Sequence, residues 1–558
     1  MVCNLNFKNI PLRNSLLITI ASVFFLLPTV TNVYIFDDEA LIRDNASIGS
    51  IDKLPSFFTS NIFGDKETGP LYRPLLMTSL FLNRVIFGHH ALAYHLVNLL
   101  LHALASLLFY QVLAGFFGHS YKSLIPALFF AVHFVHLDNV AFIINRSDII
   151  SLIFLFSGFL VLQKDKGWEN YFKFSFSSLD EIGHGYILKT FSASICLFFA
   201  FLSKESSIPI LIILLLFCFM KWLGYKQIPP WRPVGIGILI FFAFLSLYLV
   251  MRHQAIGGFG LGGAQATFFA DRSLSSVVPT MSRVFADYIY SFFVPSSFSV
   301  DYSNYRISEG IFEWRAILSY VVHLAILSIA IWRYKKNSLL SFCILAFYIT
   351  LLPVSQIIPF LDIKAMRFLY IPSIFFFLLV SMPLNYLRKE SRYFRAVLVF
   401  YTALILFFGS FSFKYSNFFE SGKILWSEMA KRSPDNLKIR FNLGNQLYKD
   451  GNYEDSIIFL EDLVKKKKDY IQAYTPLAIS YAKIGKRDKA EAFFLEGLKI
   501  NPDYPILNFN YAVFSYLNGD LNTAQRYITR AKNLSPSDGR IESIQRGIDV
   551  KISEKNKE

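Results

Sequence analysis

The chain has 558 residues, of which 54% are hydrophobic and 17% are charged, whereas a typical soluble domain has about 25% charged residues. The formal net charge is +15. Lys and Arg are concentrated in short connections between apolar runs, so membrane orientation explains this charge and no nucleic-acid partner is expected. The four cysteines show no CxxC spacing, which argues against a disulfide framework or a zinc site. These properties indicate an integral membrane protein.

The first apolar run covers about residues 14–36 and follows Lys8 and Arg13. It is too long for a signal peptide and lacks a small-residue cleavage site. We therefore predict an uncleaved membrane helix whose amino end lies in the cytoplasm. Asp37 and Asp38 follow this run directly, at the expected membrane surface.

Ten further runs are close to the roughly 20 residues with which a helix crosses a hydrocarbon core of about 30 Å. They lie near residues 91–114, 123–143, 148–163, 187–203, 206–223, 234–251, 316–333, 338–358, 367–387 and 394–413. A twelfth candidate, residues 277–298, carries Arg283 and Asp287. Because charges at membrane depth are costly unless they face a cavity, the sequence predicts eleven spans and not twelve.

Four basic connections set the orientation, because Lys and Arg accumulate in cytoplasmic loops. They read "QKDKGWENYFKF", "KWLGYKQIPPWR", "WRYKKNS" and "LRKESRYFR". Only eleven crossings place all four in the cytoplasm, so residues 277–298 are expected to be re-entrant or interfacial. Residues 34–90 then form a first extracytoplasmic loop and residues 253–315 a second large extracytoplasmic segment. The transmembrane domain comprises residues 1–413. The tail that follows it is also expected to be extracytoplasmic.

The tail contains an internal repeat with a period of 34 residues over positions 437–538. Small residues and glycines recur at equivalent places, namely Gly444, Ala478 and Ala512, and Gly451, Gly485 and Gly519. This pattern resembles three tetratricopeptide repeats, which form an α-solenoid. Residues 414–436 are expected to be a linker helix, and residues 539–558 a capping helix with a charged end. Such repeats usually bind peptides or proteins; a simple spacer is the alternative.

The ionisable residues at the span ends fall on one side of the membrane in this topology, the extracytoplasmic side. They are Asp37, Asp38, Arg73, His133, His136, Arg146, Asp148, Lys204, Glu205, Arg252 and Arg367. Ionisable groups at membrane depth are functional candidates. Carboxylates can abstract a proton from an acceptor hydroxyl, and Arg and Lys can hold a phosphate leaving group. A phosphate at this depth suggests a donor whose other half is lipid.

Each motif also has a plainer interpretation. Asp37 and Asp38 could be interfacial polarity at a helix end, and the connection that holds Lys204 could be a solvated turn. His133 and His136 could resemble a metal site, but two histidines without a clear third ligand more often form hydrogen bonds within a helix bundle. A divalent metal cofactor is therefore left open.

Several motifs occur in a characteristic order. They are "YRPLLMTSLFLNRVIFGHH", "HFVHLDNVAFIINRSDIIS", "LSKESSIPIL" and "MRFLYIPS", followed by the repeats. In this order the chain resembles the transmembrane and tetratricopeptide repeat-containing proteins, the O-mannosyltransferase family of the GT-C glycosyltransferase fold, and their bacterial relatives. The resemblance covers nearly the whole chain and implies an all-α, polytopic membrane bundle of the GT-C type with a C-terminal α-solenoid.

The resemblance implies an inverting transfer of mannose or another hexose from a polyprenyl-phosphate-linked donor to a Ser or Thr hydroxyl of an extracytoplasmic protein, which the repeats could bind. The acidic motif of the family falls on Asp37 and Asp38, with Asp37 implied as the general base and Asp38 as a group that orients the acceptor or a metal. Contact with the donor phosphate is implied for Arg146, Lys204 and Arg367. Related donor-binding motifs fall on His133, His136, Asp148 and Glu205.

The sequence departs from the family pattern at three places. Phe134 replaces a Pro, Asn145 replaces a Gly, and Met366 replaces the acid that usually precedes the arginine of the last motif. The composition leans towards a bacterial protein of the inner membrane; a eukaryotic chain would lie in the endoplasmic reticulum.

Two other functions compete with protein glycosylation. One is a glycosyltransferase that acts on a lipid or surface polysaccharide. The other is a non-catalytic scaffold or transporter in which the repeats are a docking platform. A transporter should show polar residues on both sides of its spans, whereas the cytoplasmic loops here offer mainly scattered basic residues.

Overall fold

The computed structural model describes residues 10–63, 71–163, 184–225, 231–257, 269, 273–536 and 538–555. These residues are mostly helical and contain no β-strand. The chain divides into two compact units, Met1–Ser421 and Gly422–Glu558. Most of "QKDKGWENYFKF" and part of "KWLGYKQIPPWR" lie outside the described residues.

The first unit is a bundle of α-helices. In chain order they are α1 (Ile10–Leu26), α2 (Pro74–Phe87), α3 (Ala91–Phe117), α4 (Tyr121–Val132), α5 (Leu137–Ala141), α6 (Arg146–Gln163), α8 (His184–Ser203), α9 (Ile210–Tyr225), α10 (Trp231–Ile256), α11 (Leu274–Ser291), α12 (Trp314–Arg333), α13 (Ser338–Thr350), α14 (Pro372–Ser381) and α15 (Arg392–Ser416). Several begin at a polar cap: Ser120 accepts a hydrogen bond from Lys122 N before α4, and Ser391 accepts one from Phe394 N before α15. Such caps satisfy amide groups that a helix leaves unpaired at its start.

Six helices in the described part of the chain are long and apolar enough to cross a membrane, and the bent pair α4 and α5 would make a seventh. Shorter apolar helices lie at Pro74–Phe87, Leu188–Ser203, Glu205–Met220, Ser338–Val354 and Pro372–Tyr386. Each of the eleven predicted runs overlaps one of these helices, but the count of eleven crossings is not confirmed. Helix α11, at the position of the twelfth candidate, is in neither group.

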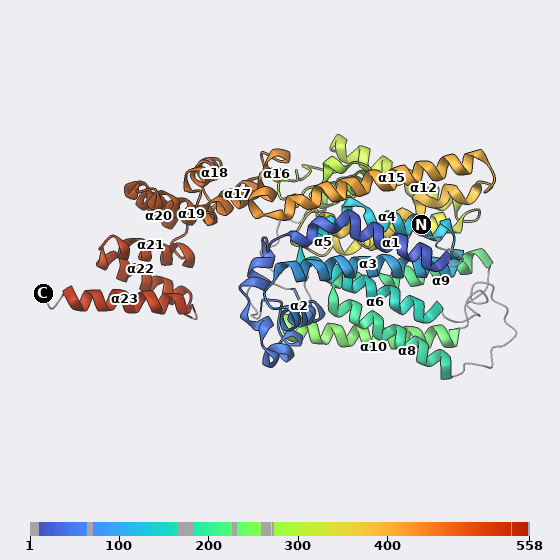
Figure 1. Ribbon diagram of the computed structural model, residues 1–558, viewed down its shortest axis with the longest axis horizontal. Coiled ribbons are helices and arrows are strands. Elements are labelled where there is room, and N and C mark those ends of the chain that lie inside the picture. Colours follow the sequence, from blue (N-terminus) through green and yellow to red (C-terminus); the bar gives the residue numbers. More distant parts are fainter. Residues whose placement is uncertain are drawn as a thin grey trace, which may run out of the picture. The chain divides into compact units, whose positions relative to one another are not determined.

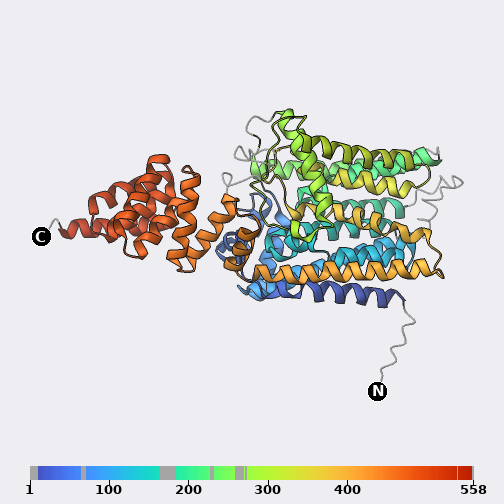
Figure 2. The same ribbon diagram turned by 90° about the horizontal axis from the view of Figure 1, so that it is seen from above.

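The long helices of this unit run side by side. Helix α3 packs against α1, α4 and α6, α6 packs against α8, and α8 packs against α10. Figures 1 and 2 show that the axes of these helices are nearly parallel, with the chain running in opposite directions along α1 and α3. Helix α11 packs against α12, α12 against α13, and α13 against α14. Helix α14 also contacts α4.

The chain breaks at His133, between α4 and α5, with a bend of 50°. His133 has extended backbone angles, φ −75° and ψ 133°. All residues from Phe129 to Ile149 are buried, so this broken segment carries polar side chains into the interior. The break therefore positions six of the polar residues discussed below, namely His133, His136, Asp138, Asn139, Arg146 and Asp148.

The second unit begins with α16 (Gly422–Arg432), which is followed by a stack of helical hairpins. The hairpins are α17 (Leu437–Lys449) with α18 (Tyr453–Lys466), α19 (Tyr474–Lys483) with α20 (Arg487–Ile500), and α21 (Pro505–Leu517) with α22 (Leu521–Leu534), and α23 (Gly539–Lys555) packs on α22. The predicted glycines Gly451, Gly485 and Gly519 have φ of 80°, 80° and 84°, a conformation that residues with a Cβ adopt at a cost.

Candidate active site

Lys204 and Glu205 lie in a tight turn directly after α8. Lys204 N donates to Ala200 O at 3.0 Å, and Lys204 then adopts an extended conformation before a short 3-10 turn at Glu205–Ser207. Both side chains are buried, with exposed fractions of 4% and 3%. The turn after α8 therefore delivers two charged groups to the interior of the bundle.

Asp148 binds Lys204 across the bundle. Lys204 Nζ lies 2.6 Å from Asp148 Oδ2, and the same oxygen accepts a hydrogen bond from Asn139 Nδ2 at 2.9 Å. Asp148 stands in the first turn of α6, where the helix dipole favours an acid. The buried lysine is thus compensated by a carboxylate that a second side chain holds in place.

Glu205 is held by arginines from other parts of the chain. Arg73 precedes α2 and contacts Glu205 through Nη2 to Oε1 at 2.7 Å and Nε to Oε2 at 3.3 Å. Arg252, near the end of α10, also interacts electrostatically with Glu205. The pairing of Arg73 with Glu205 is the two-contact geometry that Arg favours with carboxylates.

Arg367 is a further cation near Lys204 and Glu205, and it lies in a short 3-10 helix before α14. Its backbone N donates to Asp138 Oδ2 at 3.1 Å, and its guanidinium contacts Asp362 and lies 3.6 Å from Asp138 Oδ2. Burial opposes the charged form, but Asp362 and Asp138 outweigh burial and raise the pKa of Arg367, with a smaller contribution from Asp37. The Arg367 side chain keeps 23% of its surface exposed.

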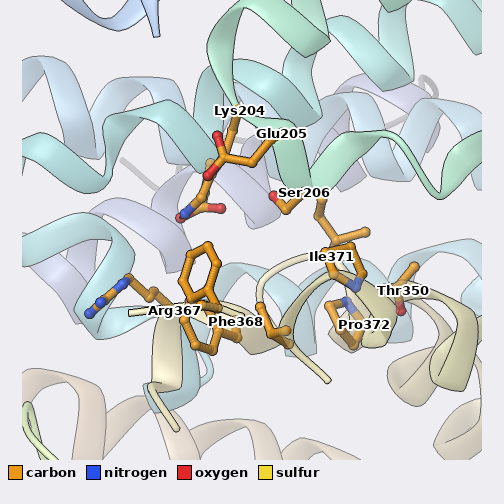
Figure 3. Close-up of a pocket in the computed structure, with 12 residues that line it drawn as sticks. Lys204, Glu205, Ser206, Thr350, Arg367, Phe368, Ile371 and Pro372 are labelled. Atoms are coloured by element: carbon orange, nitrogen blue, oxygen red, sulfur yellow. The ribbon is translucent and has the colours of Figure 1, made fainter. Parts of the chain in front are cut away.

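These side chains meet at one pocket with a volume of about 450 Å³, open solvent included. Its lining residues are Asp148, Lys204, Glu205, Ser206, Thr350, Pro353, Val354, Phe360, Arg367, Phe368, Ile371 and Pro372. Figure 3 shows Lys204, Glu205 and Ser206 on one wall, with Arg367 and Phe368 opposite. The pocket thus combines acids, bases and apolar side chains at the end of several helices.

Asp37 and Asp38 differ in their surroundings. Asp38 is buried, and its two carboxylate oxygens accept hydrogen bonds from Ile143 N and Ile144 N, both at 2.9 Å. Burial raises the pKa of Asp38 to about 7, against the lowering effect of the two backbone donors. Asp37 is exposed and lies close enough to Arg367 to affect its charge.

Arg146 lies inside the bundle and not on the pocket. It has no exposed surface, and its donors meet neutral oxygens from α2 and α3. The acceptors within 3 Å are Asn98 Oδ1 at 2.5 Å, Asn83 Oδ1 at 2.9 Å and Tyr94 O at 2.9 Å. In this structure Arg146 therefore joins α6 to its neighbouring helices.

His133 and His136 are also interior groups. Both ring nitrogens of His136 have partners, Phe130 O at 2.7 Å and the Ser373 hydroxyl at 2.9 Å. His133 Nε2 lies 3.1 Å from Phe292 O. Within the described residues no three His, Cys, Asp or Glu side chains are grouped to hold a metal ion, so the structure offers no donor set to which a divalent metal can be assigned.

The pocket network contains residues that were not among the candidates. Asn139 holds Asp148, and Asp138 and Asp362 hold Arg367. Asp362 stands five positions before Arg367 in the same connection and contacts its guanidinium. Asp362 could have been predicted as a partner of Arg367 because it is an acid in the same connection. No sequence pattern identifies Asn139.

Comparison with known proteins gives three kinds of match. Residues 471–504 match the tetratricopeptide repeat family. The chain is 23% identical to the human protein O-mannosyl-transferase TMTC3 over 84% of this chain and 53% of that protein. It is 25% identical to the Caenorhabditis elegans protein O-mannosyl-transferase F38B6.6 over 80% of this chain and 61% of that protein. A shorter stretch, 24% of this chain and 16% of the relative, is 36% identical to the mouse protein O-mannosyl-transferase TMTC2.

Among solved structures, the apo form of the Archaeoglobus fulgidus oligosaccharyltransferase aligns with 79% of this chain and 60% of its own, with a TM-score of 0.41 and 13% identity. The chain spans about half the length of the TMTC3 proteins that it matches. It is thus a homologue of the transmembrane and tetratricopeptide repeat-containing protein O-mannosyltransferases, and it contains a tetratricopeptide repeat.

Proposed function

We propose that this protein is a multi-pass membrane glycosyltransferase of the GT-C type. It transfers mannose or another hexose from a polyprenyl-phosphate-linked donor to Ser or Thr hydroxyls of extracytoplasmic proteins. The similarity to protein O-mannosyl-transferases over most of the chain supports this proposal. The observation that carries it is the pocket that Lys204 and Arg367 line from opposite walls, together with apolar side chains.

Lys204 and Arg367 would bind the donor phosphate. Lys204 Nζ has three hydrogens and donates one of them to Asp148; the Arg367 side chain is 23% exposed. Each cation can therefore add a charge-assisted hydrogen bond to a phosphate oxygen while it keeps its carboxylate partner. Such bonds stabilise the negative charge that grows on the phosphate as the sugar leaves.

Asp37 would act as the general base. Its carboxylate takes the proton of the acceptor hydroxyl, and the hydroxyl oxygen forms a bond to the anomeric carbon. The bond from that carbon to the phosphate oxygen breaks, and polyprenyl phosphate leaves with the bonding electron pair. Attack from the face opposite the phosphate inverts the anomeric centre. Asp37 suits this role because it is exposed near Arg367, whereas Asp38 is buried.

The arrangement in the membrane follows from the same proposal. The pocket and the repeats would face the extracytoplasmic side, in a bacterial inner membrane or the endoplasmic reticulum. The repeats would bind the acceptor protein, since stacked helical hairpins offer extended surfaces for peptides.

The test compares Asp37→Asn with Glu39→Gln, two neighbouring acids in the same segment. Glu39 pairs with Arg43, so its substitution controls for the loss of one acidic group at this place. Glycoproteomics of host cells should show loss of hexose from specific secreted Ser or Thr residues in Asp37→Asn and an unchanged profile in Glu39→Gln. An altered surface polysaccharide with an unchanged glycoproteome would show that the acceptor is a polysaccharide and not a protein. No change in either fraction would favour the scaffold and refute the catalytic proposal.

A further inference from the structure

The pocket has chemically different walls. Asp148, Lys204 and Glu205 bring charge from α6 and the turn after α8, and Arg367 adds a cation. The rest of the lining is largely apolar: beside Ser206 and Thr350 it consists of Pro353, Val354, Phe360, Phe368, Ile371 and Pro372. A ligand that fills this pocket must therefore combine an anionic group with hydrocarbon.

The apolar wall continues to the surface of the protein. Residues 352–361 supply Pro353, Val354 and Phe360 to the pocket. The same segment exposes large apolar side chains, with exposed fractions of 76% for Ile357, 51% for Ile358 and 40% for Leu361. Within ten residues, the chain thus offers apolar side chains to the pocket and to the exterior.

Gln356 fixes the shape of this segment. It has a positive φ of 62°, which non-glycine residues rarely adopt. Its Nε2 donates to Phe360 O at 3.2 Å and to Asp362 O at 3.1 Å, and its Oε1 accepts from Phe360 N at 3.0 Å. These bonds keep Phe360 buried beside the pocket while Ile357 and Ile358 stay exposed.

We propose that residues 352–361 bind the isoprenoid chain of the donor. The units next to the phosphate would lie against Val354 and Phe360, and the chain would leave the pocket across Ile357, Ile358 and Leu361 into the bilayer. This inference rests on the proposed function for the identity of the donor. The inference assigns residues 352–361 to the lipid part of the donor. It also implies that the affinity for the donor depends on the length of the lipid chain.

The first test uses a photoreactive polyprenyl monophosphate that carries no sugar, with the purified full-length protein in lipid nanodiscs. Cross-links mapped by mass spectrometry should concentrate in residues 352–361. Unlabelled polyprenyl phosphate should compete with them and the neutral polyprenol should not, because Lys204 and Arg367 select the anion. Helix α12 is the internal control, since it also exposes apolar side chains such as Ile331 and Leu324. Equal labelling of α12 and residues 352–361, or labelling without competition, would show ordinary bilayer contact and overturn the proposal.

The second test separates the chain from the phosphate. The double variant Ile357→Ser/Ile358→Ser should weaken competition by undecaprenyl phosphate at least about tenfold and leave competition by the short farnesyl phosphate unchanged, because only the long chain reaches these residues. The matched control is Leu324→Ser/Ile331→Ser on α12, which should change neither. Equal weakening for both lipids, or none, would contradict the inference. Since neither test needs sugar transfer, binding without transfer would refute only the proposed function, and transfer without these cross-links would refute only this inference.

Discussion

Arg73 and Glu205 form a buried ion pair with two contacts, 2.7 and 3.3 Å long, although they stand 132 positions apart. Arg73 immediately precedes α2, and Glu205 begins the turn after α8. The pair therefore fixes the first polar connection of the chain against the turn that carries Lys204. Because the Arg73 side chain is 7% exposed and that of Glu205 is 3% exposed, neither charge can be solvated if its partner is lost.

Replacement of Arg73 by Met should lower the free energy of unfolding by about 3 kcal/mol, near the lower end of the range for a broken buried pair, because Arg252 still interacts with Glu205. The double variant Arg73→Met/Glu205→Gln should recover part of the loss, since it removes the unpaired charge. Thermal unfolding in detergent measures both. Arg43→Met is the control: Arg43 pairs with Glu39 and Asp44 at the surface, and its loss should cost less than about 1 kcal/mol. Equal shifts for Arg43→Met and Arg73→Met would contradict the buried-pair argument.

Asp38 caps the chain before α6, and Asp38→Asn should separate this role from that of Asp37. At pH 8, where Asp38 is ionised and both of its oxygens accept from a backbone N–H, an Asn amide would turn its NH2 group towards one of these donors. The expected cost is about 1–3 kcal/mol of stability, seen as a lower unfolding temperature. Asp37→Asn, at an exposed site, should unfold like the wild type while it loses transfer activity. If Asp38→Asn unfolds like the wild type, the cap does not stabilise the fold.

The stability contributed by Asp38 should depend on pH. Burial raises the pKa of Asp38 from its ordinary 3.8 to about 7, so the folded state holds a proton that the unfolded state releases. The contribution is fully present below about pH 4 and is lost as pH rises towards about 7. The difference in unfolding temperature between wild type and Asp38→Asn should therefore shrink over this interval. A difference that is constant from pH 4 to 8 would mean that the pKa of Asp38 is unshifted.

The local patterns of the sequence predict much of the helical structure. Apolar runs locate the helices, and the 34-residue period places the glycines of the repeat turns, because both depend on residues close in sequence. The period cannot explain Gly444, which stands where Ala478 and Ala512 occur. A Cβ at Gly444 would lie 2.7 Å from Leu460 Cδ2. The close packing of α17 against α18 therefore favours glycine at this position.

In the candidate site, too, the sequence predicts which residues are present, whereas packing between helices determines their partners. The order of motifs places Asp148, Lys204, Glu205 and Arg367 at one level, and the pocket contains all four. The sequence treats Arg146 as equivalent to Lys204, but long-range packing gives Arg146 neutral acceptors in the interior. Which carboxylate pairs with which cation depends on contacts across the bundle, and no local pattern records those contacts.

Lys364 should position Arg367 without touching the donor. Lys364 Nζ lies 3.4 Å from Asp287 Oδ2 and 4.6 Å from the ring centre of Tyr302. The next residue, Ala365, donates its backbone N to the Tyr288 hydroxyl at 3.2 Å. These contacts hold the segment that ends at Arg367 against α11. Loss of the ammonium group in Lys364→Met should let the Arg367 guanidinium shift from the phosphate.

Displacement of a group that stabilises the leaving phosphate should lower kcat roughly tenfold to a hundredfold and change KM little. Lys364→Arg should recover part of kcat because it keeps the charge opposite Asp287. Lys335→Met is the matched control, since Lys335 is exposed and lies over Tyr334. Initial rates with a polyprenyl-phosphate-linked mannose and a peptide acceptor, normalised to the amount of folded protein, measure these effects. A reduced amount of folded protein with an unchanged kcat would show that Lys364 stabilises the fold and does not position Arg367.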